Sequence, residues 1–260
     1  MGRVNGDVQE NVLVDLIKKS GGCAVVDGGF STQLEIHGAC INDPLWSALC
    51  LIKAPDLVKL VHLEYLEAGA DVLVTSSYQA TIPGFLSRGL SLEEAESLLT
   101  KSVRLAVEAR DKFWSSGKRK SGHNYNRALV AASIGSYGAY LADGSEYSGN
   151  YGTSITLEKL KDFHRRRLQV LVEAGPDLLA FETMPNKLEA QRTAKAIVVY
   201  PNSGETWDGT AKTWQPSKCV HDEFELLATT WRDAGAKLIG GCCRTTPSTI
   251  CLISRVVKDT

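Results

Sequence analysis

The sequence predicts an α/β fold of the (β/α) TIM-barrel type, in which short buried strands run parallel and helices cover them. Three segments share one pattern: an amphipathic helix ends at a glycine and a short apolar strand follows, in 65–75, 172–182 and 231–243. Glycine ends a helix readily because it adopts the left-handed conformation without strain. A helix followed at once by an all-apolar strand is typical of βαβ units, which form parallel sheets.

Three more strands are expected in the same style, which brings the total to six. They lie at 24–26, 128–134 and 196–200. Helices are expected to begin where Ser or Thr can accept a hydrogen bond from a free helical N–H, or where Pro fits the first turn. These start signals are Pro55, Ser91 with Glu94, Thr156, and Thr246 with Pro247. The first three of the helices should extend to about residues 66, 114 and 173.

Polar residues follow each expected strand at its carboxyl end. They fall in 27–29, 75–78, 135–138, 182–185, 200–205 and 240–243. The loops after the strands build the site of a barrel, so this arrangement favours one shared site there. An open doubly wound sheet places its site at the same ends, and the pattern alone leaves both alternatives open. The pair Gly28-Gly29 lacks the G-x-G-x-x-G spacing of a dinucleotide site.

Composition indicates one ordinary globular domain over 1–260. The chain is 43% hydrophobic and 23% charged, with a formal net charge of -1. This charge gives no reason to expect nucleic acid or a membrane as a partner. The first nine residues are polar, and no apolar run approaches the length of a membrane span. With seven cysteines and no secretory start, we expect reduced thiols and a cytoplasmic location.

Four polar side chains and one glycine are candidates for binding a small ligand. Asp27 follows a buried strand and precedes Gly28, which allows close backbone approach; a turn-forming Asp is the alternative. Glu182 follows apolar residues, where a carboxylate is costly unless paired, so we expect a ligand ammonium or a structural ion pair beside it. Thr75 could bind a ligand or its own backbone, and Asn202 could bind a ligand or form a plain turn.

The adjacent Cys242 and Cys243 are the strongest chemical signal in the chain. They end an apolar strand, and Gly240 and Gly241 before them let the backbone approach an ion or ligand. Because adjacent side chains face different directions, packing alone does not explain both. Thiolates in this position suit zinc or nucleophilic chemistry. A catalytic zinc needs three protein ligands, and the chain offers only weak candidates for the third, Cys219 and His221.

The histidines give little support to other kinds of active site. None of them shows metal-ligand spacing, and no Ser-His-Asp or His-Glu-x-x-His pattern is present. We therefore expect them in helices or loops at the surface, at His37, His62, His123, His164 and His221.

Five motifs taken together resemble those of the homocysteine S-methyltransferases. Their residues are most similar to those of the plant enzymes that use S-methylmethionine. The resemblance covers nearly the whole chain. The motifs are Asp27-Gly-Gly, Thr75-Ser-Ser-Tyr, Phe181-Glu-Thr-Met-Pro, Tyr200-Pro-Asn-Ser-Gly-Glu and Gly240-Gly-Cys-Cys-Arg-Thr-Thr-Pro.

The resemblance implies a zinc-dependent (β/α)₈ barrel that transfers a methyl group to homocysteine and forms methionine. The donor is S-methylmethionine or S-adenosylmethionine. Cys242 and Cys243 would be two of three zinc thiolates. Asp27 and Glu182 would bind the amino group of homocysteine, while Thr75 and the backbone around Gly28 would line the same pocket, with Asn202 also among the substrate-binding residues.

The chain departs from the family pattern between Glu182 and the fifth strand. The family's third zinc cysteine lies in a Gly-x-Asn-Cys motif, and no Asn-Cys occurs here. A barrel uses about 30 residues per βα unit, so six strands in place of eight leave about 60 residues missing. We expect an internal deletion near 191–195 and an incomplete barrel. The alternative to an active enzyme is therefore an inactive, truncated form with an incomplete zinc site, which is unstable or acts only through protein contacts.

Overall fold

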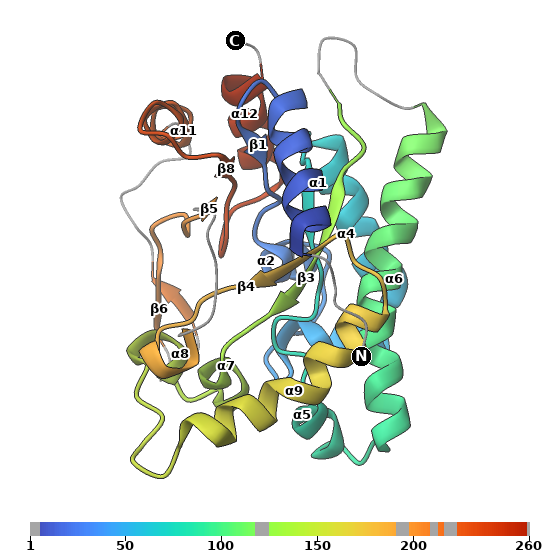
Figure 1. Cartoon of the computed structure of the whole chain (residues 1–260), viewed down its shortest axis with the longest axis vertical. Coiled ribbons are helices and arrows are strands. Elements are labelled where there is room, and N and C mark those ends of the chain that lie inside the picture. Colours follow the sequence, from blue (N-terminus) through green and yellow to red (C-terminus); the bar gives the residue numbers. More distant parts are fainter. Residues whose placement is uncertain (1–5, 118–124, 191–197, 209–212, 216–222, 259–260) are drawn as a thin grey trace.

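Six parallel strands form the centre of the protein (Figure 1). The computed structural model describes residues 6–117, 125–190, 198–208, 213–215 and 223–258. Two three-stranded sheets, β1-β8-β5 and β2-β3-β4, are joined by a parallel bridge between Val26 and Val72, which gives the order β5-β8-β1-β2-β3-β4. The strands are β1 (Ala24–Val25), β2 (Val72–Val74), β3 (Leu129–Ile134), β4 (Leu178–Phe181), β5 (Val198–Val199) and β8 (Leu238–Ile239).

Helices follow the strands, as the alternating pattern predicts. The longest helices that follow a strand are α4 (Pro55–Glu67), α6 (Leu92–Ser116), α9 (Leu157–Glu173), α11 (Glu223–Asp233) and α12 (Pro247–Lys258). A helix α1 (Gly6–Lys19) precedes the first strand. Shorter helices are α2 (Phe30–Ile36), α3 (Leu49–Lys53), α5 (Ile82–Leu86), α7 (Tyr137–Leu141), α8 (Ser145–Ser148) and α10 (Lys187–Ala190), with a 3₁₀ turn at Trp46–Ala48.

The predicted helix starts at Ser91, Thr156 and Pro247 are confirmed. Ser91 accepts a hydrogen bond from the N–H of Glu94, and the Glu94 carboxylate accepts one from the N–H of Ser91, which completes the capping box. Thr156 caps α9 through the N–H of Lys159. Pro247 is the first residue of α12. Each of these signals involves only residues within one turn of the helix, so it does not depend on the tertiary fold.

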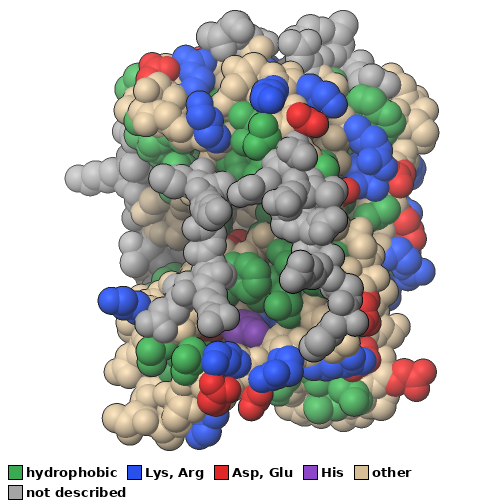
Figure 2. All heavy atoms as spheres, in the orientation of Figure 1, with side chains coloured by type: hydrophobic (Ala, Val, Ile, Leu, Met, Phe, Trp, Pro, Cys, Tyr) green, Lys and Arg blue, Asp and Glu red, His purple; other side chains and the backbone are tan. Residues whose placement is uncertain are grey.

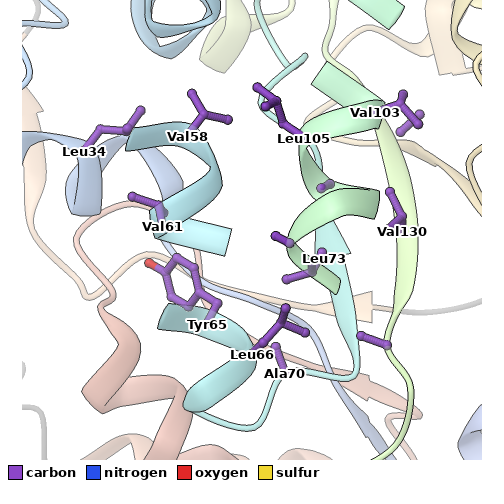
Figure 3. Packing of buried hydrophobic residues seen from close by; sticks show 14 of the residues in the cluster. Leu34, Val58, Val61, Tyr65, Leu66, Ala70, Leu73, Val103, Leu105 and Val130 are labelled. Carbon is purple, nitrogen blue, oxygen red and sulfur yellow. The ribbon is translucent and has the colours of Figure 1, made fainter. Parts of the chain in front are cut away.

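Alternating strand residues divide the core into two clusters, one on each face of the sheet. The larger cluster contains Leu73 and Val130 and packs against α4 and α6 (Figure 3). The smaller cluster contains Val72, Leu129 and Ala131, and α1 places Leu16 on it. Both faces of the strands are therefore covered by apolar side chains, which explains why the strand sequences are apolar throughout.

The aspartate of the repeated pattern binds the neighbouring strand. The carboxylate of Asp71 accepts a hydrogen bond from the N–H of Val25 at 3.0 Å. Asp177, at the matching place of the next repeat, accepts one from the N–H of Val130 at 2.8 Å. Each carboxylate thus satisfies a backbone donor at the amino end of the preceding strand. The third repeat carries Lys237 instead, whose carbonyl accepts from the N–H of Ala24.

The predicted barrel is not closed among the described strands. β4 pairs only with β3, and β5 pairs only with β8, so these two are the edges of the sheet. All six residues of β3 are buried, whereas all four of β4 are half-buried and Val198 of β5 is 36% exposed. The expected deletion near 191–195 falls outside the described residues.

Two features differ from the sequence expectation. His62 is not at the surface: it is 0% exposed on α4, and its ring packs 4.7 Å from that of Phe30. A short antiparallel hairpin, β6 (Thr206–Asp208) with β7 (Thr213–Gln215), follows β5 and was not predicted.

The surface carries charges of both signs. Figure 2 shows basic and acidic side chains interspersed on the face that is seen in the orientation of Figure 1. Among the described residues, no helix combines the length and the apolar character that crossing a membrane requires.

Candidate functional site

The predicted site residues come together at the carboxyl ends of the strands. Asp27 follows β1, Thr75 follows β2, Glu182 follows β4, Asn202 lies after β5 and the cysteine pair follows β8. Parallel strands bring these ends to one rim, so residues up to 216 positions apart meet there, as in the hydrogen bond from the N–H of Gly29 to Thr245.

Asp27 is a buried carboxyl at the centre of this rim. It is 3% exposed, and its Oδ2 accepts a hydrogen bond from the N–H of Val74 at 2.9 Å. Burial raises the pKa of Asp27 well above its usual range, against the effect of the Val74 hydrogen bond, and the nearby charge of Glu182 raises it further. A buried carboxyl beside another is stabilised in its charged form by a bound cation.

Glu182 is the second carboxyl, and the hydroxyl of Ser133 of β3 donates a hydrogen bond to it. Burial raises the pKa of Glu182, while hydrogen bonding from the Ser133 and Tyr200 hydroxyls and the positive charge of Arg167 act in the opposite direction. No ion pair to Glu182 is formed among the described residues, so the position remains suited to a ligand ammonium.

The two glycines after β1 let the cysteine loop approach the strand. A Cβ on Gly28 would lie 2.9 Å from Oγ1 of Thr245 and 3.0 Å from the ring of Tyr65. A Cβ on Gly29 would lie 2.4 Å from the carbonyl oxygen of Cys242. Only glycine leaves room for this contact, which places the loop after β8 directly over Asp27.

Thr75 and Asn202 both bind the protein's own backbone. Oγ1 of Thr75 accepts a hydrogen bond from the N–H of Ser133 at 3.0 Å, which favours the backbone alternative for this residue. Oδ1 of Asn202 accepts one from the N–H of Cys243 at 3.1 Å. Asn202 is therefore more than a plain turn residue, because it holds the cysteine loop in place.

The two cysteines present their sulfur atoms to each other. Sγ of Cys242 donates to Sγ of Cys243 across 3.9 Å, and both residues are half-buried. This hydrogen bond raises the pKa of Cys242, with burial acting in the same direction, and lowers that of Cys243, whose thiolate it stabilises.

The thiol pair fits two positions of a zinc site but not a complete one. With Zn–S bonds of about 2.3 Å, two tetrahedral ligands lie about 3.8 Å apart, close to the observed separation. Among the described residues, however, no group of three or more Cys, His, Asp or Glu side chains is placed to hold a metal. The weak third candidates, Cys219 and His221, lie outside the described residues.

Several residues of the rim were not singled out from the sequence. Arg167 of α9 is 1% exposed and donates hydrogen bonds to the carbonyls of Ser77, Tyr78 and Gly135. It has no sequence signal, because an Arg in an amphipathic helix is usually at the surface. Tyr200 did have one, since it is the last residue of the expected strand 196–200.

Comparison with known proteins decides the family. The family model described as "Homocysteine S-methyltransferase" matches residues 24–196 and 189–257. The chain belongs to the homocysteine S-methyltransferase family. A relative named "Homocysteine S-methyltransferase 1" from Arabidopsis thaliana is 62% identical over 316 residues, covering 95% of this chain and 97% of the relative.

Solved structures of this family have the same fold. The oxidized form of the homocysteine methyltransferase MmuM from Escherichia coli has a TM-score of 0.76 and 34% identity, covering 94% of this chain and 98% of that one. The metallated form of the same protein has a TM-score of 0.71 and 33% identity, covering 95% of this chain and 99% of that one.

Proposed function

We propose that this site transfers a methyl group from S-methylmethionine or S-adenosylmethionine to homocysteine, giving methionine. One observation carries the proposal: the buried carboxyl of Asp27 and the half-buried carboxyl of Glu182 share a rim with the thiols of Cys242 and Cys243. Homocysteine has an ammonium group at one end and a sulfur at the other, so it can meet both pairs at once. The similarity to enzymes of this name supports the same substrate.

The site residues orient the substrate more than they react with it. The ammonium lies between Asp27 and Glu182, and Asn202 holds the backbone of the thiol loop. The substrate sulfur attacks the methyl carbon as a thiolate, its proton having gone to solvent. The new S–C bond forms as the bond to the sulfonium sulfur breaks, and the donor leaves as a neutral thioether. No general base is needed at the methyl group, so positioning and exclusion of water supply the catalysis.

We propose Zn²⁺ as the cofactor of this reaction. Cys242 and Cys243 would hold it, together with a third ligand from outside the described residues. When bound, zinc keeps a thiol ionised at neutral pH. That a metallated form of the Escherichia coli relative exists supports a metal as the cofactor.

We infer that the chain is a single domain that lacks an internal segment near 191–195. Two observations support this. The family model matches in two pieces that meet at 189–196. The comparison with the Arabidopsis relative runs over 316 residues, more than the 260 of this chain. We also propose that the protein acts in the cytoplasm.

The same observations favour a second candidate, a form with little or no turnover. The described ligand set has two thiols where a catalytic zinc needs three protein ligands. Among the described strands, β4 and β5 each have one unpaired edge, and such edges favour contacts with other chains. This form would act through protein contacts alone.

Zinc content and methionine formation measured on one purified sample separate the two candidates. Near one zinc per chain with turnover supports the enzyme, and a third ligand must then come from the undescribed residues. No zinc and no turnover supports the inactive form. Inserting the matching segment of a relative between Gln191 and Lys195 should then raise turnover at least about 100-fold, because misplacement by about 1 Å costs that much. A complete barrel without turnover would contradict the proposed reaction.

A further inference from the structure

A buried arginine without a carboxylate partner lies behind the rim of the site. Arg167 of α9 is 1% exposed, and burial lowers its pKa to about 10, so the guanidinium is still charged at neutral pH. The other buried arginine of the described residues, Arg110, forms ion pairs with Asp111 and Asp177. Among the described residues, no ion pair includes Arg167. A buried charge of this kind is costly unless hydrogen bonds compensate it, so the hydrogen bonds that it forms indicate its role.

The guanidinium joins the loops that follow β2 and β3. Its Nη2 donates to the carbonyl of Ser77 at 2.6 Å and to that of Tyr78 at 2.8 Å, and its Nη1 donates to the carbonyl of Gly135 at 3.0 Å. The two loops touch here, because a Cβ on Gly135 would lie 2.4 Å from the carbonyl oxygen of Tyr78. One side chain thus holds three carbonyls on two loops, which the planar fork of arginine can do and the single amino group of lysine cannot.

Three successive hydrogen bonds connect this guanidinium to Glu182. The first is the one from Arg167 to the carbonyl of Ser77. The second runs from the hydroxyl of Ser77 to the carbonyl of Ser133 at 2.8 Å, and the third from the hydroxyl of Ser133 to the carboxylate of Glu182. Thr75 adds a further contact between the same loops, since its Oγ1 accepts from the N–H of Ser133. Both serines are 0% exposed, so water does not compete for these bonds.

We propose that Arg167 is a positioning residue: through two buried serines it holds the Glu182 carboxylate where a ligand ammonium binds, and it thereby gives the site its preference for thiols that carry an amino group. The inference rests on the proposed function, because it takes homocysteine as the ligand. The positive charge of Arg167 supports this role, since it acts against the rise that burial causes in the pKa of Glu182. A ligand without an amino group does not use Glu182, so its affinity should not depend on Arg167.

The test compares two ligands on the full chain, purified with zinc present. Homocysteine carries an amino group, whereas 4-mercaptobutanoate has the same thiol and carboxylate without it. Arg167→Lys keeps the positive charge but loses the fork, so it cannot hold all three carbonyls. In this variant, calorimetry should show homocysteine affinity reduced about 10-fold, because a hydrogen bond to a charged group is weakened. Affinity for 4-mercaptobutanoate should change less than about 2-fold, since no such bond to this ligand is altered.

A second variant tests the path through the serines. Ser133→Ala removes the hydroxyl that binds Glu182, and it should also reduce homocysteine affinity about 10-fold. Because both changes break one chain of hydrogen bonds, the double variant should lose about 10-fold, and not the roughly 100-fold of two independent effects. Should Arg167→Lys fail to fold, Ser77→Ala interrupts the chain next to Arg167. A Ser77→Ala chain without a selective loss for homocysteine would then overturn the proposal.

The matched control changes the other buried arginine. Arg110 binds Asp177, which lies just before β4 and therefore at the opposite end of the strand from Glu182. Arg110→Lys should lower the stability of the protein and leave the ratio of the two affinities unchanged. A selective loss for homocysteine in this control would show that any disturbed buried arginine has the effect, and it would overturn the role of Arg167.

The outcomes separate this inference from the proposed function. A wild-type chain that binds homocysteine no more tightly than 4-mercaptobutanoate has no ammonium site, and both proposals fail. A wild-type chain that prefers homocysteine, with the same preference in Arg167→Lys, supports the ammonium site and overturns the role of Arg167. An equal loss for both ligands in Arg167→Lys indicates general damage to the site and also overturns it. Losses that multiply in the double variant would show that Arg167 does not act through Ser133.

Discussion

Strands β3 and β4 are neighbours with equally apolar sequences, and they differ in burial. They pair in parallel from Ala131 with Leu178 to Ile134 with Phe181. All residues of β3 are buried, and all those of β4 are half-buried, because among the described strands β3 has a neighbour on each side and β4 has one on a single side. The sequence Leu-Leu-Ala-Phe of β4 is typical of an interior strand. Among the described strands, however, β4 lies at an edge of the sheet.

This difference in burial indicates which side of the sheet contributes more to the stability of the protein. The side formed by β1, β2 and β3 has covered faces and its own buried polar contacts. The side formed by β4 and β5 leaves apolar surface and backbone groups without a strand partner, a situation that natural sheets avoid with charges or bulges. Substitutions on the covered side should therefore cost more, and three measurements test this comparison.

The largest effect is expected beneath the covered side, at the ion pair of Lys258 with Asp71. Nζ of Lys258 lies 2.8 Å from Oδ1 of Asp71, and the two side chains are 3% and 0% exposed. Lys258→Met leaves a buried carboxylate without its cation, so the free energy of unfolding should fall by about 3–5 kcal/mol. Urea denaturation measures it.

The control for this variant is an exposed pair. Arg165 and Asp162 lie 3.0 Å apart with both side chains largely in water. Arg165→Met should change the free energy of unfolding by less than about 1 kcal/mol. Equal effects of the two variants would show that the covered side is no more dependent on its buried contacts than the surface is.

A pair of truncations tests the comparison directly. Ile134 of β3 is 0% exposed, while Leu179 of β4 is half-buried and has the same number of carbon atoms. Ile134→Ala should lower the free energy of unfolding by about 3 kcal/mol, and Leu179→Ala by about half as much, because less apolar area is returned to water. A cost for Leu179→Ala that matches Ile134→Ala would mean that β4 is covered in solution.

The smallest effect near neutral pH is a pH dependence from His62 behind the covered side. Burial lowers the pKa of His62 to about 3, so the folded protein keeps this ring neutral while the unfolded chain takes up a proton near pH 6.5. Stability from this group is therefore complete above pH 6.5 and falls by about 1.4 kcal/mol for each pH unit below it. His62→Phe should flatten this part of the stability profile; an unchanged slope would show that another group causes it.

Much of the fold followed from local signals. The capping box of Ser91 and Glu94, the start at Pro247 and the six apolar strands depend on residues close in sequence, and all are present. The gathering of Asp27, Glu182 and the cysteine pair was predicted from their place after strands. Arg167 and His62 were missed because burial of a polar residue depends on which helix face meets the core, and an isolated residue carries no sign of it.

By itself, the sequence determined the α/β class, the parallel strands and the family motifs, since each rests on apolar periodicity or on short spacings along the chain. Only the tertiary structure decided that Ser133 binds Glu182, that Asn202 binds the backbone of Cys243, and that β4 and β5 are the edges among the described strands. These contacts join residues far apart in the chain, so they depend on the curvature of the sheet and on which strands are present to close it.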